Sequence, residues 1–321
     1  MPEVRFLPLR PLALASLVAN VALVVTGAAV RLTGSGLGCP TWPRCTDGSY
    51  TTTAEMGVHG VIEFGNRMLT FALGVIAVAC VIAALLEKPR RRSRVLLSVA
   101  VLFYIPLQAV VGGITVLTDL NPWVVGIHFL ISIVIIAFAY ALWRRAAEGD
   151  GPPVPLVPRP INHLVWILSA VSAAVIALGV VVTGSGPHAG DEDAKRNGLD
   201  PATVSQAHAD VVFLLIGLTV ALVFALRAVK APTATVRAAV VLLVVELAQG
   251  LIGFVQYFTH LPVALVAAHM LGASLVWAGT VAVLLAIRDR PALPTPDAPP
   301  APSSADVSPA EPSAAPVSTS H

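Results

Sequence analysis

The stretch LQAVVGGITVLTDLNPWVVGIHFL at residues 107–130 matches a second stretch, LAQGLIGFVQYFTHLPVALVAAHML at residues 247–271. The offset is 141 residues throughout, and the aligned pairs are Gln108 with Gln249, Gly112 with Gly253, Thr118 with Thr259, and His128 with His269. Each stretch is apolar on both sides of a short polar turn. The match predicts an internal repeat, and it sets the register for comparing the two halves of the chain.

Apolar runs of about 20 residues recur along the whole sequence, each long enough to cross a hydrocarbon core roughly 30 Å thick. Of all residues 56% are hydrophobic and 12% charged, and the mean hydropathy is +0.82, which excludes an ordinary soluble domain. The first run is longer than the apolar core of a signal peptide. We expect eight transmembrane helices near residues 11–30, 62–86, 96–117, 123–143, 162–183, 205–226, 237–257 and 263–287.

The motif TGSG ends the first and the fifth span, at residues 33–36 and 183–186. Four spans per repeat give both halves the same orientation. The sequence therefore predicts an all-α polytopic membrane protein whose eight helices form two pseudo-symmetric four-helix bundles. The expected division is an N-terminal bundle at 1–143, a cytoplasmic Pro-rich linker at 144–161, a C-terminal bundle at 162–288, and a disordered Pro/Ala/Ser-rich tail at 289–321.

Lysine and arginine collect on one side of the predicted spans, which carries fifteen of the twenty basic residues, from Arg5 and Arg10 to Arg288 and Arg290. The positive-inside rule then places both termini in the cytoplasm of a multi-pass cell-membrane protein. The net charge of +2 reflects this topology and indicates no nucleic-acid partner.

Three histidines fall one or two turns below the outer surface, at His128, His208 and His269 on the fourth, sixth and eighth spans. Two neutral imidazoles meeting at one depth in a helical bundle can supply both axial ligands of a heme iron. The repeat counterpart of His208 is Asn66, so the first half has one such histidine and the second half a pair. The alternative is that each histidine satisfies a backbone carbonyl or lies in the interfacial belt.

Glu63 is a carboxyl just inside the membrane, where ionisable groups are costly and commonly functional. It shares a helix face with His59, Asn66 and Arg67. One interpretation is a self-neutralising Glu63–Arg67 ion pair. The other is a polar cluster opposite His128, in which Glu63 accepts protons near a heme edge while Arg67 and Arg31 hold propionates. The role of a second buried carboxyl, Glu246, is open.

Cys39 and Cys45 bracket CPTWPRC in the first outer loop. On the oxidising side of the membrane such a pair can close a disulfide. A metal site is the rival interpretation, although no histidine lies near. Nicotinamide and flavin fingerprints of the G-x-G-x-x-G type are absent from the sequence.

The motifs GLGCPTWPRC, VIEFGNR, GIHF, QAHAD and AAHML, in this order, resemble the heme A synthase family of bacteria and mitochondria up to about residue 288. The resemblance implies a membrane oxidoreductase that converts the C8 methyl group of heme O to a formyl group by successive hydroxylations, with water as oxygen source, for heme-copper oxidase biogenesis. It implies a resident heme b on His208 and His269, and a substrate heme at His128 with Glu63 as the catalytic carboxylate. Cys39 and Cys45 correspond to the family's loop disulfide, structural or redox-active.

One position departs from the family, whose second span carries Glu-x-x-His-Arg, because Asn66 takes the place of the histidine. An amide is a poor iron ligand. We expect the substrate heme to be held by His128 alone, five-coordinate or water-ligated. The alternative ligand, His59, lies about 10.5 Å higher on the helix.

The partners implied are heme O, handed over by the heme O synthase (a farnesyltransferase), and a membrane electron acceptor. Whether the protein forms a homo-oligomer is open.

Two rival functions remain. A diheme, quinol oxidoreductase-like electron-transfer cytochrome would hold two hemes without needing Glu63. A proton-coupled transporter built from the repeats would use Glu63 and Glu246 as proton-coupling groups and need no iron.

Overall fold

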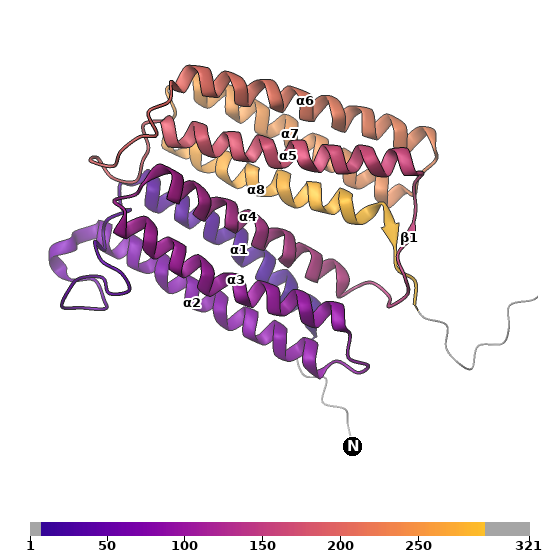
Figure 1. Cartoon of the computed structure of the whole chain (residues 1–321), viewed down its shortest axis with the longest axis horizontal. Helices are drawn as coiled ribbons and strands as arrows, with labels where there is room; N and C mark the ends of the chain where they lie inside the picture. The colour runs from indigo at the N-terminus through magenta and orange to yellow at the C-terminus, as the bar shows by residue number, and fades with distance from the viewer. Residues whose placement is uncertain (1–7, 293–321) are drawn as a thin grey trace, which may run out of the picture.

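The computed structural model describes residues 8–292, which form long helices joined by short connections (Figure 1). All eight α-helices are long and apolar enough to cross a membrane, and the predicted all-α polytopic fold is confirmed. In chain order the helices are α1 (Leu9–Leu32), the single-turn 3-10 helix η1 (Ala54–Met56), α2 (Gly57–Leu86), α3 (Arg92–Leu117), α4 (Pro122–Arg145), α5 (Arg159–Ser185), α6 (Pro201–Ala228), α7 (Thr233–Phe258) and α8 (Val263–Ala286).

Several helices begin earlier than the apolar runs predict, and polar side chains cap two of them, α4 and α6. α2 begins five residues before the predicted span, at Gly57, and α6 four residues before, at Pro201. The side chain of Asp200 accepts a hydrogen bond from the Thr203 N–H at 2.8 Å, and Asn121 makes the same kind of cap on α4 at 3.0 Å. Both caps precede a proline at the first helical position, whose fixed φ suits a helix start.

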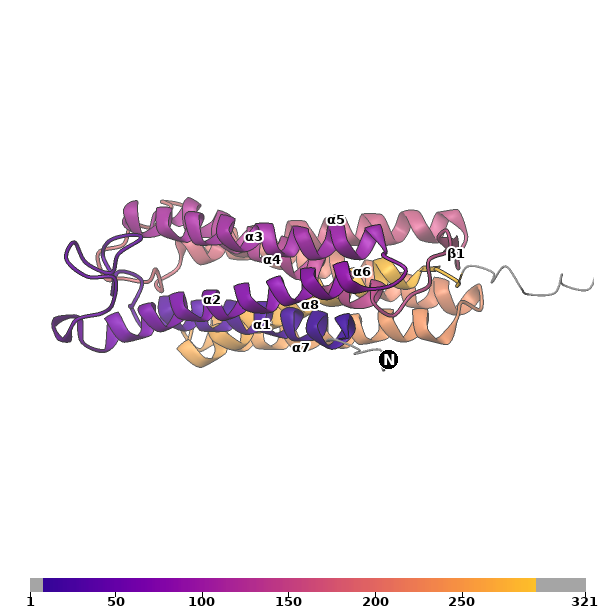
Figure 2. The same cartoon turned by 90° about the horizontal axis from the view of Figure 1, so that it is seen from below.

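The helices fall into two groups of four by their contacts. α1 and α3 each contact α2 and α4, and α5 and α7 each contact α6 and α8. The groups meet where α8 packs against α1 and α4, and where α4 packs against α5. Figure 1 shows the two groups as an upper and a lower layer, and Figure 2 shows the helices running nearly along one axis. Helices α2 and α4 therefore lie diagonally opposite in the first group, as do α6 and α8 in the second.

The buried side chains do not divide as cleanly as the sequence repeat. One core cluster draws all its buried residues from 157–287. The largest cluster of the first half includes Ile176 from α5, and Trp277 from α8 packs against it. Packing across the boundary joins the halves, and their division into separate domains stays a prediction.

The repeat is visible in the helix bounds. α7 has the 26 residues of α3, and α8 the 24 residues of α4, both displaced by 141 positions at each end. The two turns also match, since Asp119 and Leu120 have positive φ angles and so do His260 and Leu261. The repeat inferred from the sequence extends to the backbone of these connections.

The predicted linker forms a short ribbon with the chain that follows α8. Strand β1 (Val154–Pro155) pairs antiparallel with β2 (Arg288–Asp289), and the Gly149 N–H donates to the Arg290 carbonyl at 3.0 Å. Asp289, with which the predicted tail begins, thus lies in a strand. Residues 293–321 of that tail, and Arg5 at the other end, lie outside the described residues.

Candidate heme-binding sites and the disulfide loop

The three candidate ligand histidines lie in the second turn of their helices. His128 is six residues into α4, His269 six residues into α8, and His208 seven residues into α6. At 1.5 Å per residue this places each about 10 Å from its helix start. These helix starts lie at the end of the molecule that carries the α1–α2 loop, opposite the β1–β2 ribbon (Figure 1).

His208 and His269 occupy diagonally opposite helices of the second group, α6 and α8. The Nδ1 atoms of both rings are buried, and neither makes a hydrogen bond of ordinary geometry within residues 8–292. The His208 ring does lie close to the Val175 carbonyl of α5, whereas the His269 ring has no such neighbour within the same residues. A buried polar atom without a partner costs free energy, so the His269 ring in particular is poorly explained as a satisfied core histidine. Their placement across the middle of a four-helix group fits a ligand that lies between them.

Each candidate histidine lies against a glycine of a neighbouring helix. A Cβ atom built on any of these glycines would come closer to the imidazole Cε1 than an ordinary van der Waals contact. The pairs are Gly112 with His128 at 3.1 Å, Gly179 with His208 at 3.2 Å, and Gly253 with His269 at 3.3 Å. Glycine at these positions lets each ring approach the backbone of the neighbouring helix.

A glutamine supports two of the histidines from the adjacent helix. Gln108 Nε2 donates to the His128 carbonyl at 3.0 Å, and Gln249 Nε2 donates to the His269 carbonyl at 2.6 Å. The sequence repeat contains both glutamines, yet a repeated residue type does not reveal its partner. These bonds fix the register of α3 on α4 and of α7 on α8 next to the imidazoles.

The donor set fits a heme better than a bare metal ion. Among the described residues no group of three or more His, Cys, Asp or Glu side chains could hold a metal ion. A porphyrin supplies four of the iron ligands itself, so two imidazoles complete the coordination. The buried Nδ1 atoms and the glycine contacts are therefore compatible with a heme held by His208 and His269.

The first half has one imidazole and an amide in the corresponding places. The Nδ1 atom of His128 is again buried without a partner among the described residues. On the diagonal helix α2, Asn66 Oδ1 accepts a hydrogen bond from Thr26 Oγ1 at 2.8 Å. His59 is exposed in the first turn of α2, and its Nδ1 lies 2.9 Å from Ser35 Oγ. Asn66 thus contacts the C-terminal part of α1, and His59 contacts a residue that follows α1.

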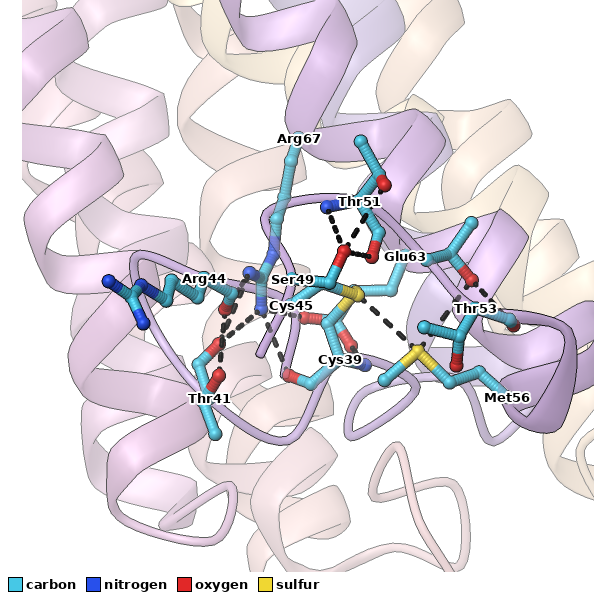
Figure 3. The surroundings of a disulfide bond; sticks show 11 residues. Cys39, Thr41, Arg44, Cys45, Ser49, Thr51, Thr53, Met56, Glu63 and Arg67 are labelled. Carbon is cyan, nitrogen blue, oxygen red and sulfur yellow. Dashed lines mark hydrogen bonds and ion pairs between the residues drawn. A yellow bond between two sulfur atoms is a disulfide. The ribbon is translucent and has the colours of Figure 1, made fainter. Parts of the chain in front are cut away.

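Glu63 and Arg67 hold the loop that contains the disulfide (Figure 3). Glu63 is 6% exposed, and its Oε2 accepts the Cys39 N–H at 2.6 Å. Its Oε1 pairs with Arg67 Nη2 at 2.5 Å, and the same guanidinium donates to the carbonyls of Cys39, Thr41 and Arg44 at 3.0–3.2 Å. The ion pair considered from the sequence is present. Because its members also hold backbone groups, it fixes the loop as well as neutralising itself.

The disulfide suggested by the sequence is formed, with the Cα atoms of Cys39 and Cys45 4.4 Å apart and both side chains fully buried. Cys80 is buried in α2 as a free thiol. Three groups restrain the loop, which are the disulfide, the carboxylate of Glu63 and the guanidinium of Arg67, the last two being paired with each other.

Arg31 joins the two halves at the same end of the molecule. Its Nε donates to the His188 carbonyl at 2.5 Å and its Nη2 to the Thr183 carbonyl at 2.7 Å. The His188 ring in turn lies 2.9 Å from the Leu261 carbonyl. The guanidinium groups of Arg31 and Arg67 thus both donate hydrogen bonds to backbone carbonyls. Their expected contact with heme propionates stays a prediction.

A sequence model of the cytochrome oxidase assembly protein family (COX15-CtaA) matches residues 10–281, most of the chain. The chain belongs to this family. The match covers all eight helices almost completely, and with them the loop held by Glu63 and Arg67.

Curated relatives of this family member carry the name heme A synthase. The chain is 33% identical over 137 residues to the protein of Listeria welshimeri, covering 42% of this chain and 44% of that protein. It is 28% identical over 185 residues to the protein of Symbiobacterium thermophilum, covering 54% and 58%. It is 27% identical over 143 residues to the protein of Bacillus licheniformis, covering 44% of this chain and 46% of that protein. The chain thus matches about half the length of these relatives.

Glu246 lies apart from these sites, 3% exposed in the middle of α7. Its Oε1 accepts a hydrogen bond from Thr219 Oγ1 at 2.9 Å, while its Oε2 is buried with no partner in the described part of the chain. Neither candidate heme site includes it.

Proposed function

We propose that this protein is a heme A synthase, which oxidises the C8 methyl group of heme O to the formyl group of heme A. The observation that carries the proposal is the difference between two repeat-related sites. The second has imidazoles on diagonal helices, whereas the first combines one imidazole with a buried, tightly held carboxylate. Family membership and the names of the relatives support the same conclusion.

The second site is the place for a resident heme b, held by His208 and His269. When bound there, the heme supplies a one-electron redox centre close to the other half of the protein. The chain contributes ring orientation through Gly179 and Gly253, and helix register through Gln249. The surrounding apolar helices exclude water from the site.

The first site is the place for the substrate, held by His128 on α4. Each hydroxylation adds one oxygen from water and releases two protons and two electrons, so the methyl group becomes an alcohol and then a geminal diol. The diol loses water to leave the formyl group. One turnover thus consumes one net water and releases four protons and four electrons, the latter to a membrane electron acceptor.

Glu63 is the group that accepts protons in this scheme. Its carboxylate is held from both oxygens, by the Cys39 N–H and by the Arg67 guanidinium. This fixes its position before the substrate arrives, which is how a general base gains efficiency. Its place near the start of α2 gives the released protons a short route to the nearby end of the molecule.

The topology of the proposal follows from the basic residues. Both termini lie in the cytoplasm, and the heme sites and the disulfide loop face the outer side. The substrate arrives through the membrane, handed over by the heme O synthase. The two sites belong to the N-terminal and C-terminal bundles predicted from the repeat.

The test is the pigment content of membranes that contain this protein and a supply of heme O. The native protein is expected to form heme A and to retain heme b after purification. Glu63→Gln keeps a hydrogen-bond acceptor for Cys39 but loses the base, and heme A formation should fall by about 10²- to 10⁴-fold with heme b retained. Glu246→Gln, at a buried carboxyl outside both sites, is the matched control and should leave the rate unchanged.

The rival functions give different results in the same experiment. A diheme electron carrier would hold two hemes and be indifferent to Glu63→Gln. A proton-coupled transporter would purify without any porphyrin. Either result would reject the proposed synthase.

A further inference from the structure

A cavity of about 380 Å³ lies at the end of the molecule opposite the candidate heme sites. Four segments form it, which are the α2–α3 turn, the end of α4, the linker and the chain after α8. The charged residues of its wall are Arg90, Arg91, Arg92, Arg145, Asp150 and Arg290. A single cavity thus gathers five guanidinium groups and one carboxylate.

The positive charge of this arginine cavity is only partly neutralised. Arg91 Nε pairs with Asp150 at 2.6 Å, and Arg145 Nη1 pairs with Glu148 at 3.0 Å. Arg90, Arg92 and Arg290 have no carboxylate partner within residues 8–292. An excess of three positive charges faces one small space.

Other positive charges lie close to Arg290. Partial burial, followed by the positive charges of Arg145 and Arg288, lowers the pKa of its guanidinium below the ordinary value. An anion in the cavity would relieve that repulsion.

The wall of the cavity is held in place by a buried arginine outside it. Arg94 is almost fully buried, and it donates to the carbonyls of Arg145 and Glu148 at 3.0 Å each. It also pairs with Glu87 at 2.8 Å. These bonds join the start of α3 to the end of α4, so the guanidinium groups are positioned before a ligand binds.

An exposed apolar stripe leads away from the cavity along α3. Leu96, Val99 and Phe103 follow Arg92 at spacings of four, seven and eleven residues, which places them on one face of the helix. Their exposed fractions are 56%, 44% and 64%. Since α3 spans the membrane, this face meets lipid, and acyl chains can lie along it directly below Arg92.

We propose that the arginine cavity binds the phosphate of an anionic phospholipid headgroup, with the acyl chains against the α3 stripe. A phosphate diester offers the oxygen acceptors that guanidinium groups recognise. Basic cavities between helices at the cytoplasmic side of membrane proteins suit such headgroups. The stripe distinguishes a lipid from a soluble phosphate, which would gain nothing from exposed leucine and phenylalanine side chains.

The test is native mass spectrometry of the purified full-length protein titrated with phosphatidylglycerol or phosphatidylcholine of the same chains. Glycerol 3-phosphate and inorganic phosphate serve as headgroups without chains. The variant Arg90→Gln/Arg92→Gln/Arg290→Gln removes the unpaired charges. The control Arg159→Gln/Arg227→Gln/Arg237→Gln removes as many charges on the same predicted side, away from the cavity.

Phosphatidylglycerol is expected to bind the native protein and the control, with affinity reduced on the order of 100-fold in the cavity variant, since each arginine near the surface contributes about fivefold. Equal binding of phosphatidylcholine, or an equal loss in both variants, would overturn the site. Binding of inorganic phosphate as tightly as the lipid would retain an anion site and overturn its assignment to lipid. None of these results depends on heme, so the outcome is separate from the fate of the proposed synthase.

Discussion

The two halves of this protein share their scaffold and differ in the side chains of their candidate sites. On α3–α4 and on α7–α8 the same three residues recur, a glutamine bonded to a histidine carbonyl and a glycine beneath its ring. On the diagonal helix, α6 presents His208 whereas α2 presents Asn66. A duplicated framework has thus kept one histidine-bearing helix pair in both halves and changed the helix opposite.

The outer loops differ as much as the diagonal helices. The first half has a loop closed by the Cys39–Cys45 disulfide and bound to Glu63 and Arg67 on α2. The corresponding loop of the second half contains no cysteine. Asn66, in the place of a histidine, and the fixed carboxylate of Glu63 occur on the same helix, α2. This association supports the proposal that the first half carries the chemistry and the second holds a cofactor.

The largest effect is expected from removing a ligand in the second half. His269→Ala should reduce heme b in the purified protein to near zero, because a neutral imidazole is lost from the iron. His128→Ala should leave heme b in place and abolish heme O binding. His163→Ala, at an exposed histidine near the start of α5, is the control for both. Retention of heme b in His269→Ala would break the proposed division of labour; absorbance and extracted pigment measure it.

The next effect concerns the departure at Asn66. Asn66→His makes the first half resemble the second, and we expect a substrate heme that changes from high-spin to low-spin as a second imidazole binds. Heme A formation should fall at the same time, because the open iron position is filled. Optical and electron paramagnetic resonance spectra of the heme O-loaded protein provide the measurement. An unchanged spin state would argue that Asn66 does not face the substrate.

A smaller effect is expected beneath the rings. Gly253→Ala places a methyl group about 3.3 Å from His269 Cε1, and overpacking of this kind costs about 1–3 kcal/mol. Weaker heme b retention should follow, and Gly112→Ala should weaken heme O binding instead. Gly250→Ala is the control, because nothing lies near its Cβ and alanine stabilises a helix by about 0.5–1 kcal/mol. If Gly250→Ala and Gly253→Ala behave alike in thermal release of heme, the ring contact has no role.

The smallest effect is confined to the first outer loop. Cys39→Ser/Cys45→Ser removes a short cross-link worth roughly 2 kcal/mol in the chain-entropy account, so amide exchange in residues 39–53 should accelerate by about 30-fold. The loop before α6 has no such cross-link and serves as the internal reference. Hydrogen exchange with mass spectrometry reports both loops in one sample. Equal protection of the loop in both forms would show that Glu63 and Arg67 suffice to hold it.

Local sequence patterns predict much of this molecule. The eight spans, the 141-residue repeat, the depth of His128 and His269, and the pairing of Cys39 with Cys45 all follow from such patterns. The errors lie at helix ends, where caps such as Asp200 extend α6 beyond its apolar run. The β1–β2 ribbon was not predicted, since its two strands are short and far apart in the sequence.

The contacts around the candidate sites needed more than a pattern. Gly179 beneath His208 has no glycine counterpart in the first half, where Ala29 takes the equivalent position by the TGSG offset. A repeat search therefore passes over it. The expectation that Arg31 and Arg67 hold propionates is based on their charge. The sequence does not reveal that both side chains also donate hydrogen bonds to backbone carbonyls.

The sequence by itself determined the number of helices, their order and the helices that carry the imidazoles. In a membrane each span must satisfy its own backbone hydrogen bonds, so hydropathy and spacing alone dictate these features. Only the tertiary structure decided that the Cys39 N–H meets Glu63, that Arg31 ties the two halves together, and that five arginines surround one cavity. Those contacts depend on how helices distant in sequence pack side by side, and no local pattern encodes that geometry.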